Sequence, residues 1–267
     1  MMDSLLVIVP HPDDEILTCG GWLYERQARG LPTWVVVVTN GDVAGSAAGL
    51  ARLRESLAGL QVLGVRSDQV VFLGYADTGM SVDDSFLYGL FAEDDSSRIH
   101  LGRAGVATYG LPDHLDFRTR MYGRAAPYTR GDLVADLRAL IGEHRPETIV
   151  TTAPEDTHGD HAALYWFVRE VVSGFESYRP NILTALVHSA DGDAAWPRRS
   201  GEDTAMTVPY CLAGYPLPIS RLLTPQARLA KGAALRCHAT ALTADAREFL
   251  EAFLKRDELF WIRQADD

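Results

Sequence analysis

The sequence has few cysteines. Its three, Cys19, Cys211 and Cys237, are widely spaced, and no CxxC pair is present. An odd number of isolated thiols indicates neither a disulfide framework nor a thiolate zinc site. Because structural disulfides belong mainly to oxidising compartments, this cysteine usage predicts a cytoplasmic protein.

Clustered basic residues and long apolar runs are also missing. The chain carries 25 Lys and Arg against 36 Asp and Glu, which gives a net charge of −11, and no basic block stands out. Contacts to nucleic-acid phosphates need clustered basic side chains, so we do not expect nucleic acid as a partner. No apolar run approaches the ~20 residues of a membrane-spanning helix, so no span is expected. The first residues show no signal-peptide pattern either.

The sequence does contain short apolar runs, and they alternate with segments in which apolar residues recur at helical spacing. With 267 residues, 47% of them apolar, it can build a full core. Unbroken apolar runs predict strands buried on both faces at about residues 4–10, 33–39, 69–73, 147–152 and 182–188. Spacing of the apolar residues predicts helices at about residues 14–29, 46–64, 131–144 and 162–173. This order predicts an α/β fold: a Rossmann-like, doubly wound, mainly parallel sheet with helices on both faces.

Two segments depart from this rhythm. Residues 75–130 are rich in Gly, Asp, Arg and Tyr, and their aromatics favour an ordered insertion over the catalytic edge rather than a disordered linker. Residues 190–267 are expected to form a C-terminal cap with helices at about 225–239 and 244–256, in which Trp196-Pro197 could be an aromatic lid that stacks on a ligand or simply packing. No repeat or shift in composition marks a second domain, so we expect one domain over residues 1–267.

Two polar motifs follow predicted strands. Residues 10–15 read Pro-His-Pro-Asp-Asp-Glu after the first strand, and residues 158–161 read His-Gly-Asp-His after the fourth. In a doubly wound sheet, ligands bind outside the carboxyl ends of the strands, where strand order reverses. The topology therefore predicts that the two motifs face each other across one site. A capping role is the simpler explanation for either motif alone, but so many charged groups beside a buried strand favour a metal ion.

The residue types agree with a catalytic metal site. Two imidazoles and one carboxylate with an open position are a common catalytic zinc set, and the surplus groups can supply a general base and an oxyanion partner. Asp160 could hold one imidazole through its second ring nitrogen. His-His-Asp donors also accept Fe²⁺ or Co²⁺. The residues by themselves leave open which side chain has which role.

These motifs resemble those of the LmbE-like, or PIG-L, zinc-dependent N-acetylglucosaminyl de-N-acetylases. That family includes enzymes acting on N-acetylglucosaminyl-phosphatidylinositol, on the mycothiol precursor and on glycosylated antibiotics. The similarity continues in three further segments, which lie at residues 52–64, 74–80 and 231–238. The segments that resemble the family occur in the family's order over most of residues 4–240, and the insertion is the least informative part of that range.

The resemblance implies a role for each matching position. It assigns three ligands to one zinc ion per chain: His11, Asp14 and His161. Asp13 matches the general base that activates the metal-bound water. His158 matches the histidine that stabilises the oxyanion or protonates the leaving amine, and Asp160 would support a histidine. The sequence departs from the mycothiol enzymes at Asp156, where they carry a tyrosine, and this lowers the expectation of their particular substrate.

The reaction implied is hydrolysis of an N-acetyl or other N-acyl group from a small amino-sugar glycoconjugate. Two alternatives from other classes remain. One is a metal-dependent hydrolase of another ester or amide in natural-product biosynthesis. The other is a non-catalytic carbohydrate-binding relative, which would be expected to have lost a ligand or the base. Neither the sugar nor the oligomeric state can be read from the sequence.

Overall fold

A computed structural model describes residues 3–189, 196–197 and 204–263. Its sheet contains seven strands in the order β3-β2-β1-β4-β5-β7-β6. Five strands are parallel: β1 (Leu5–Val9), β2 (Thr33–Thr39), β3 (Val70–Tyr75), β4 (Thr148–Thr152) and β5 (Asn181–Ala185). Two strands, β7 (Asp257–Arg263) and β6 (Ile219–Leu222), extend the sheet in antiparallel pairing beyond β5. The predicted Rossmann-like, mainly parallel sheet is confirmed.

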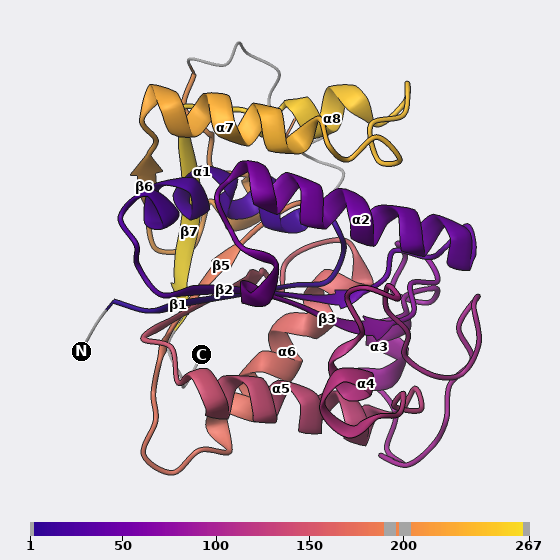
Figure 1. Ribbon diagram of the computed structural model, residues 1–267. Helices are drawn as coiled ribbons and strands as arrows, with labels where there is room; N and C mark the ends of the chain where they lie inside the picture. Colours follow the sequence, from indigo (N-terminus) through magenta and orange to yellow (C-terminus); the bar gives the residue numbers. More distant parts are fainter. Residues whose placement is uncertain (1–2, 190–195, 198–203, 264–267) are drawn as a thin grey trace.

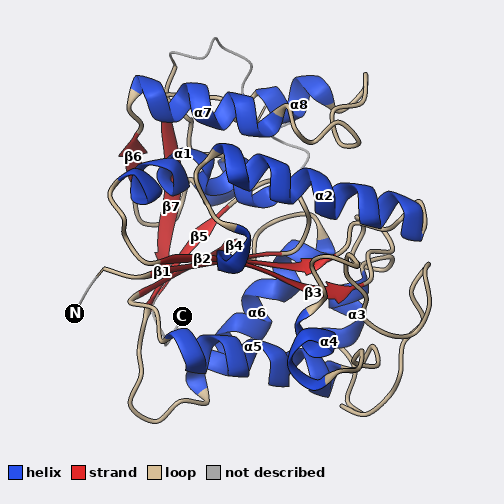
Figure 2. Ribbon diagram, viewed as in Figure 1, coloured by secondary structure: helices blue, strands red, loops and turns tan. Residues whose placement is uncertain are grey.

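Helices cover both faces of the sheet (Figures 1 and 2). One face carries α1 (Asp14–Ala28), α2 (Ser46–Val62), α7 (Pro225–Leu235) and α8 (Arg247–Glu251). The other carries α3 (Phe86–Phe91), α4 (Phe117–Tyr122), α5 (Arg130–His144) and α6 (Gly159–Ser173). Two short 3₁₀ turns, η1 (Ser67–Gln69) and η3 (Tyr210–Leu212), complete the described elements.

The central strands are apolar without alternation because both of their faces are buried. In β1, Val7 and Val9 belong to the core under α1 and α2, whereas Leu6 and Ile8 belong to the core under α5 and α6. Successive side chains of a strand point to opposite faces, so a strand covered on both sides needs apolar residues at every position. This requirement is why β1 could be recognised from sequence.

The insertion after β3 is ordered, as expected. It contains α3 and α4, and Phe117 and Tyr128 from it are buried in the core. The Tyr109 hydroxyl donates a hydrogen bond of 2.9 Å to Asp42, which follows β2. Such contacts fasten the segment to the loops at the carboxyl edge of the sheet.

The C-terminal part corrects one expectation and decides between the two alternatives for Trp196. The helix expected at about 244–256 is only the short α8, and the residues after it form β7 instead. Leu259, Phe260 and Trp261 are all buried there, because β7 pairs with the edge of β5 that would otherwise be open. Trp196 is not a lid: its side chain is buried against Phe253, and its indole N–H donates to the Thr207 carbonyl at 2.9 Å.

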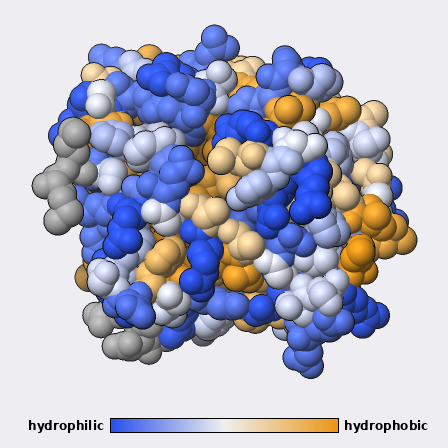
Figure 3. Space-filling view, turned by 60° about the horizontal axis from the view of Figure 1, so that its bottom comes forward, coloured by the Kyte–Doolittle hydropathy of each residue, from blue (hydrophilic) through white to orange (hydrophobic). Residues whose placement is uncertain are grey.

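The surface on the side of α4 and α5 is largely polar, with small patches of apolar residues between the polar ones (Figure 3). Within the described part of the chain, no helix combines the length and apolarity needed to cross a bilayer.

Candidate active site

The two motifs meet because β1 and β4 are neighbours. Leu6 pairs with Ile149 and Val7 with Val150 in parallel register, so both strands end at the same edge of the sheet. The first motif follows β1 and leads into α1, and the second follows β4 and leads into α6. This is the point where strand order reverses, as predicted for a ligand site in a doubly wound sheet.

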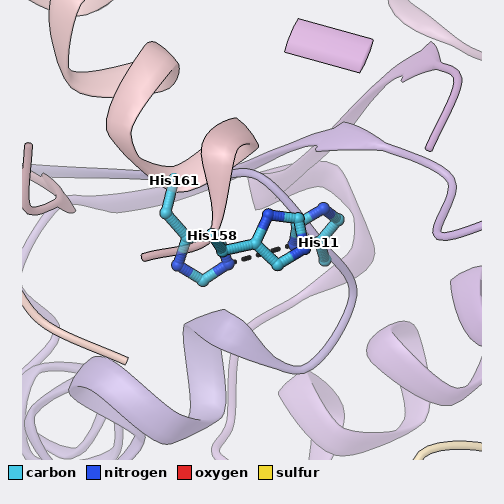
Figure 4. A group of neighbouring side chains, drawn as sticks. All are labelled: His11, His158 and His161. Atoms are coloured by element: carbon cyan, nitrogen blue, oxygen red, sulfur yellow. Dashed lines mark hydrogen bonds between the residues drawn. The ribbon is translucent and has the colours of Figure 1, made fainter. Parts of the chain in front are cut away.

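Three ligand-type atoms converge between the motifs, from His11, Asp14 and His161. Figure 4 shows the two histidines of this set together with His158. The Nδ1 atom of His11 lies 3.1 Å from Nε2 of His161. The Oδ2 atom of Asp14 lies 3.2 Å from that His11 nitrogen and 3.3 Å from the same His161 nitrogen. All three side chains are buried. The structure thus brings together the three residues that the family resemblance implies as ligands.

The second nitrogen of each imidazole is held by a carboxylate. His11 Nε2 lies 3.1 Å from Asp160 Oδ2, and His161 Nδ1 lies 3.1 Å from Asp156 Oδ2. An ionised carboxylate only accepts hydrogen bonds, so each of these nitrogens carries the proton of a neutral imidazole. The lone pairs of His11 Nδ1 and His161 Nε2 then face each other beside the Asp14 carboxylate.

The lone pairs of the two imidazole nitrogens and of the Asp14 carboxylate repel one another unless a positive charge lies among them. Burial favours the neutral imidazole, but the Asp14 and Asp156 carboxylates outweigh it and raise the pKa of His161 to about 10. A proton relieves the repulsion in that way, and a divalent cation would do so with all three atoms as ligands. The donor set therefore fits a metal ion.

Three further groups of ligand-type side chains share an imidazole with this set. One joins His11 and His161 to His158, another joins His11 to Asp77 and Asp160, and the third joins His161 to Asp156 and His188. The last two use the imidazole nitrogens that are already hydrogen-bonded to carboxylates. We interpret them as the contacts that orient the two histidines, an arrangement usual around metal ligands.

Asp13 lies beside this cluster in an unusual backbone conformation. Its φ is 113°, in a region that residues with a side chain rarely adopt and that costs about 1–3 kcal/mol. Its carboxylate lines the pocket and lies 3.3 Å from the Arg52 guanidinium. Burial raises the pKa of Asp13 to about 6, although Arg52 acts in the opposite direction. A carboxylate with a pKa near neutrality is suited to proton transfer.

Glu15, in the first turn of α1, supports the Asp13 conformation. Its buried carboxylate accepts hydrogen bonds from the Asp13 backbone N–H at 2.9 Å and the Ser56 hydroxyl at 2.5 Å. Burial raises the pKa of Glu15 to about 8.

His158 is the N-cap residue of α6. Its Nδ1 atom accepts the Asp160 backbone N–H at 3.2 Å. Burial is the main cause that holds the pKa of His158 far below its usual range, and the nearby His11 and His161 act in the same direction. The ring is therefore neutral. Because Nδ1 is the acceptor, the proton of the neutral ring resides on Nε2, and the ring has a donor to offer.

Asp156 is the functional residue that sequence reasoning missed. It was noted only because it replaces a tyrosine of the mycothiol enzymes, yet it holds His161 Nδ1. Its carboxylate also accepts the backbone N–H groups of His158, Val187 and His188. One buried carboxylate therefore ties the loop after β4 to the loop after β5. An acidic residue in a loop carries no signal of this role until its neighbours are known.

A pocket of about 270 Å³ opens onto the cluster. Besides the cluster residues, its lining includes side chains from α1, α2, α8 and the loops after β2, β3 and β5: Leu17, Val43, Arg52, Asp77, Met80, Val187, His188, Phe249 and Leu250. The last two come from α8, so the C-terminal cap contributes a wall of the pocket together with the insertion.

Three other ionisable side chains, which a search for functional residues would consider, have structural roles. His238 is buried, with its Nε2 atom 3.8 Å from Glu15, and burial lowers its pKa to about 3. Asp42 accepts the Asp77 backbone N–H and the Tyr109 hydroxyl. Arg118 forms an ion pair with Asp136, away from the residues that line the pocket.

The family of the chain is settled by comparison. Residues 6–172, more than half of the chain, match the family model PIG-L, described as GlcNAc-PI de-N-acetylase. The chain belongs to the PIG-L family. The resemblance stated from the two motifs is confirmed.

Similar PIG-L proteins are named as deacetylases of one sugar conjugate. A 1D-myo-inositol 2-acetamido-2-deoxy-alpha-D-glucopyranoside deacetylase of Saccharopolyspora erythraea is 30% identical, covering 88% of this chain and 77% of that protein. The protein of the same name from Saccharomonospora viridis is 29% identical, covering 90% of this chain and 85% of that protein. The prediction that this PIG-L chain is an enzyme of the deacetylase type is confirmed.

Solved structures share the fold at lower identity. The N,N'-diacetylchitobiose deacetylase of Pyrococcus horikoshii has a TM-score of 0.60 at 17% identity, covering 99% of this chain and 85% of that chain. The zinc-inhibited form of a teicoplanin deacetylase has a TM-score of 0.56 at 18% identity, covering 97% of each chain. Both confirm the α/β architecture.

Proposed function

We propose that this PIG-L protein removes the N-acetyl group from a small amino-sugar glycoconjugate by zinc-dependent hydrolysis. The observation that carries the proposal is the convergence of His11 Nδ1, Asp14 Oδ2 and His161 Nε2, with the Asp13 carboxylate and the His158 ring beside them. The names of the similar deacetylases support an acetamido sugar as the substrate class. The single sheet, with strands from Leu5 to Arg263, supports one catalytic domain.

His11, Asp14 and His161 would hold the metal ion. Two imidazoles and one carboxylate leave a coordination position open, which is the donor set of many catalytic zinc sites. A bound divalent ion would lower the pKa of a water molecule and polarise the acyl oxygen. The same donors accept Fe²⁺ or Co²⁺, and we propose Zn²⁺ with one ion per chain.

Asp13 is the general base in this proposal. Its carboxylate accepts a proton from the attacking water as the bond between the water oxygen and the acyl carbon forms. The same proton then passes to the amide nitrogen as the carbon–nitrogen bond breaks. The products are acetate and a free amine. Arg52, 3.3 Å from the carboxylate, positions Asp13 for both transfers.

His158 assists at the acyl group. Its neutral ring offers the proton on Nε2 either to the acyl oxygen, where negative charge develops, or to the leaving amine. Asp160 positions two groups at once: its carboxylate holds His11, and its backbone N–H fixes the His158 ring. Asp156 positions His161 in the same manner.

The test is release of acetate and amine from a panel of N-acetylated amino sugars and their glycosides. Metal-free and zinc-restored protein are assayed side by side, and bound metal is measured directly. We expect zinc-dependent release with one zinc ion per chain. Ester analogues of the same sugars test the alternative that another acyl bond is the target.

Variants separate the ligands from the base. His161→Ala should lose both zinc and activity, whereas Asp13→Asn should lose activity and keep zinc. Substitution of the exposed Asp83 by Asn serves as a matched control with the same change of charge. Full activity without bound metal, or hydrolysis of esters alone, would overturn the proposal.

A further inference from the structure

The walls of the pocket differ in chemistry from its floor. Ionisable groups gather at the floor, around His11 and His161. Away from that cluster, the lining is dominated by apolar side chains: Leu17, Val43, Met80, Val187, Phe249 and Leu250. They come from α1, from loops after β2, β3 and β5, and from α8, so apolar surface meets the pocket from several sides.

Three of these side chains form an apolar rim, which we define as Val43, Met80 and Phe249. Val43 is 45% exposed and Met80 is 57% exposed, and Phe249 is partly buried. Leu17, Val187 and Leu250 are buried deeper in the wall. Exposed apolar residues that border a binding pocket lose contact with water when a ligand covers them, which favours an apolar ligand group.

Phe249 is a rigid part of the rim. Its ring stacks on the His188 ring with centroids 5.4 Å apart and an interplanar angle of 16°. The Phe253 ring meets it edge-on, also at 5.4 Å. An aromatic side chain that is already held by two neighbours loses little further freedom on binding, so it is preorganised as a contact surface.

Two charged side chains of the lining, Arg52 and Asp77, are already engaged with the protein. Arg52 donates to the Pro12 carbonyl at 2.8 Å and pairs with Asp13. Asp77 accepts the Gly79 backbone N–H at 3.2 Å and faces His11 at 3.8 Å. Among the described lining residues, the three rim side chains are apolar and offer no hydrogen-bonding group to a hydroxyl-rich ligand. Burying such hydroxyls there would cost their hydrogen bonds to water.

We propose that the substrate carries an apolar group next to its N-acylated sugar, and that the apolar rim binds this group. The inference rests on the proposed function and extends it to the rest of the substrate. It separates this chain from the similar deacetylases, whose name specifies an inositol, a ring with hydroxyl groups on its carbons. The apolar group is either the aglycone or an acyl chain longer than acetyl.

The test compares matched substrates. In the first arm, the cyclohexyl and inositol glycosides of N-acetylglucosamine differ only in the hydroxyl groups on a six-carbon ring, and the methyl glycoside gives the baseline. In the second arm, the N-acetyl, N-butyryl and N-hexanoyl forms of the methyl glycoside differ only in acyl length. We expect kcat/KM to favour the apolar member of one arm by roughly tenfold, the effect of burying about two methylene groups.

Rim variants show where the preference arises. Met80→Gln and Val43→Thr are close in size to the original side chains and lie at exposed positions, so the double variant should fold. It should reduce the preference for the apolar member several-fold. Leu229→Gln is the matched control, because Leu229 is 73% exposed on α7 and is not among the residues that line the pocket. This control should keep the wild-type preference.

Each result of these assays either supports or overturns the inference of an apolar substrate group. A preference for the cyclohexyl glycoside that the double variant weakens supports an apolar aglycone, and a preference for longer acyl chains that it weakens supports the acyl chain. Equal or better turnover of the inositol glycoside with no acyl preference overturns the inference, as does a preference that survives in the double variant. In those cases turnover of the methyl glycoside still upholds the proposed function. No turnover of any substrate by zinc-loaded protein overturns both.

Discussion

The Glu15 carboxylate accepts a 2.9 Å hydrogen bond from the backbone N–H of Asp13, the residue whose φ is 113°. A strained conformation persists only where its surroundings hold it. Glu15 is fully buried and is itself fixed by the Ser56 hydroxyl. The last acidic residue of the first motif therefore stabilises the loop that presents the proposed base, although it does not reach the pocket lining itself.

Glu15→Ala should destabilise the protein by about 1–3 kcal/mol and lower kcat, because the Asp13 N–H loses its buried acceptor. Glu15→Gln should retain most of both, because an amide supplies the same acceptor oxygen. Urea unfolding and steady-state kinetics check these outcomes. If the Gln variant were as damaged as the Ala variant, the charge of Glu15 rather than its hydrogen bonds would be the important property.

Glu15 also predicts a dependence of stability on pH. Burial raises its pKa from 4.5 to about 8, so between these values the unfolded chain has released a proton that the folded protein keeps. Rising pH therefore favours the unfolded state across this window. The free energy of unfolding of Glu15→Gln, relative to wild type, should increase from pH 5 to pH 8. A constant difference would contradict the raised pKa.

Asp13→Asn should lower kcat by roughly 10²–10⁴-fold, the usual contribution of a general base, while zinc binding is retained. An amide cannot accept the proton of the attacking water, but it keeps the shape of the side chain. Rapid-quench kinetics and metal analysis on the same preparation measure the two effects. Loss of zinc from this variant would instead identify Asp13 as a ligand.

Asp156→Ala should weaken zinc affinity by roughly 10–100-fold, because His161 loses the carboxylate that orients its ring and fixes its proton on Nδ1. Competition with a chromogenic chelator measures the affinity. Asp68→Asn changes an exposed carboxylate and should leave zinc affinity as in wild type. Unchanged affinity in Asp156→Ala would show that His161 is oriented by packing alone.

Lys231 and Glu258 form a buried ion pair at 2.8 Å beside an irregularity in α1. Glu258 accepts the Gly21 and Trp22 backbone N–H groups, and Lys231 donates to the Leu17 carbonyl, so the pair satisfies the groups released at Cys19. Lys231→Met should destabilise the protein by about 3–5 kcal/mol, because it leaves a buried carboxylate unpaired. Differential scanning calorimetry measures the loss.

Two further variants test this account of Lys231. The double variant Lys231→Met, Glu258→Gln should recover part of the stability, since no unpaired charge remains. Arg66→Ala removes an exposed ion pair with Asp68 and should leave the thermal midpoint nearly unchanged. A Lys231→Met protein as stable as Arg66→Ala would show that water or a nearby group solvates Glu258.

The strands and the two motifs could be predicted because their signals are local. Apolar residues fill every position of β1 and all of β2 except its terminal Thr33 and Thr39, and a strand buried on both faces favours this pattern. Parallel topology then places the residues after β1 and β4 at one edge. His11 and His161 could therefore be predicted to share a site from the order of the elements alone.

The C-terminal region could not be predicted in the same way. Residues after α8 form β7 because the edge of β5 is available for pairing, and that edge lies far away in sequence. The position of Phe249 in the pocket depends on this docking as well. No pattern near Phe249 indicates that its ring reaches a histidine of another loop.

The sequence by itself determined the order of the five parallel strands, the two motifs and hence the types of chemical group at the site, since these depend on neighbouring residues and on topology. Only the tertiary structure decided which atoms face each other. It brought the Asp160 carboxylate into hydrogen-bond contact with His11, that of Asp156 with His161, and that of Glu15 with the backbone N–H of Asp13. Hydrogen bonds depend on distance and direction, and the folding of distant segments sets both.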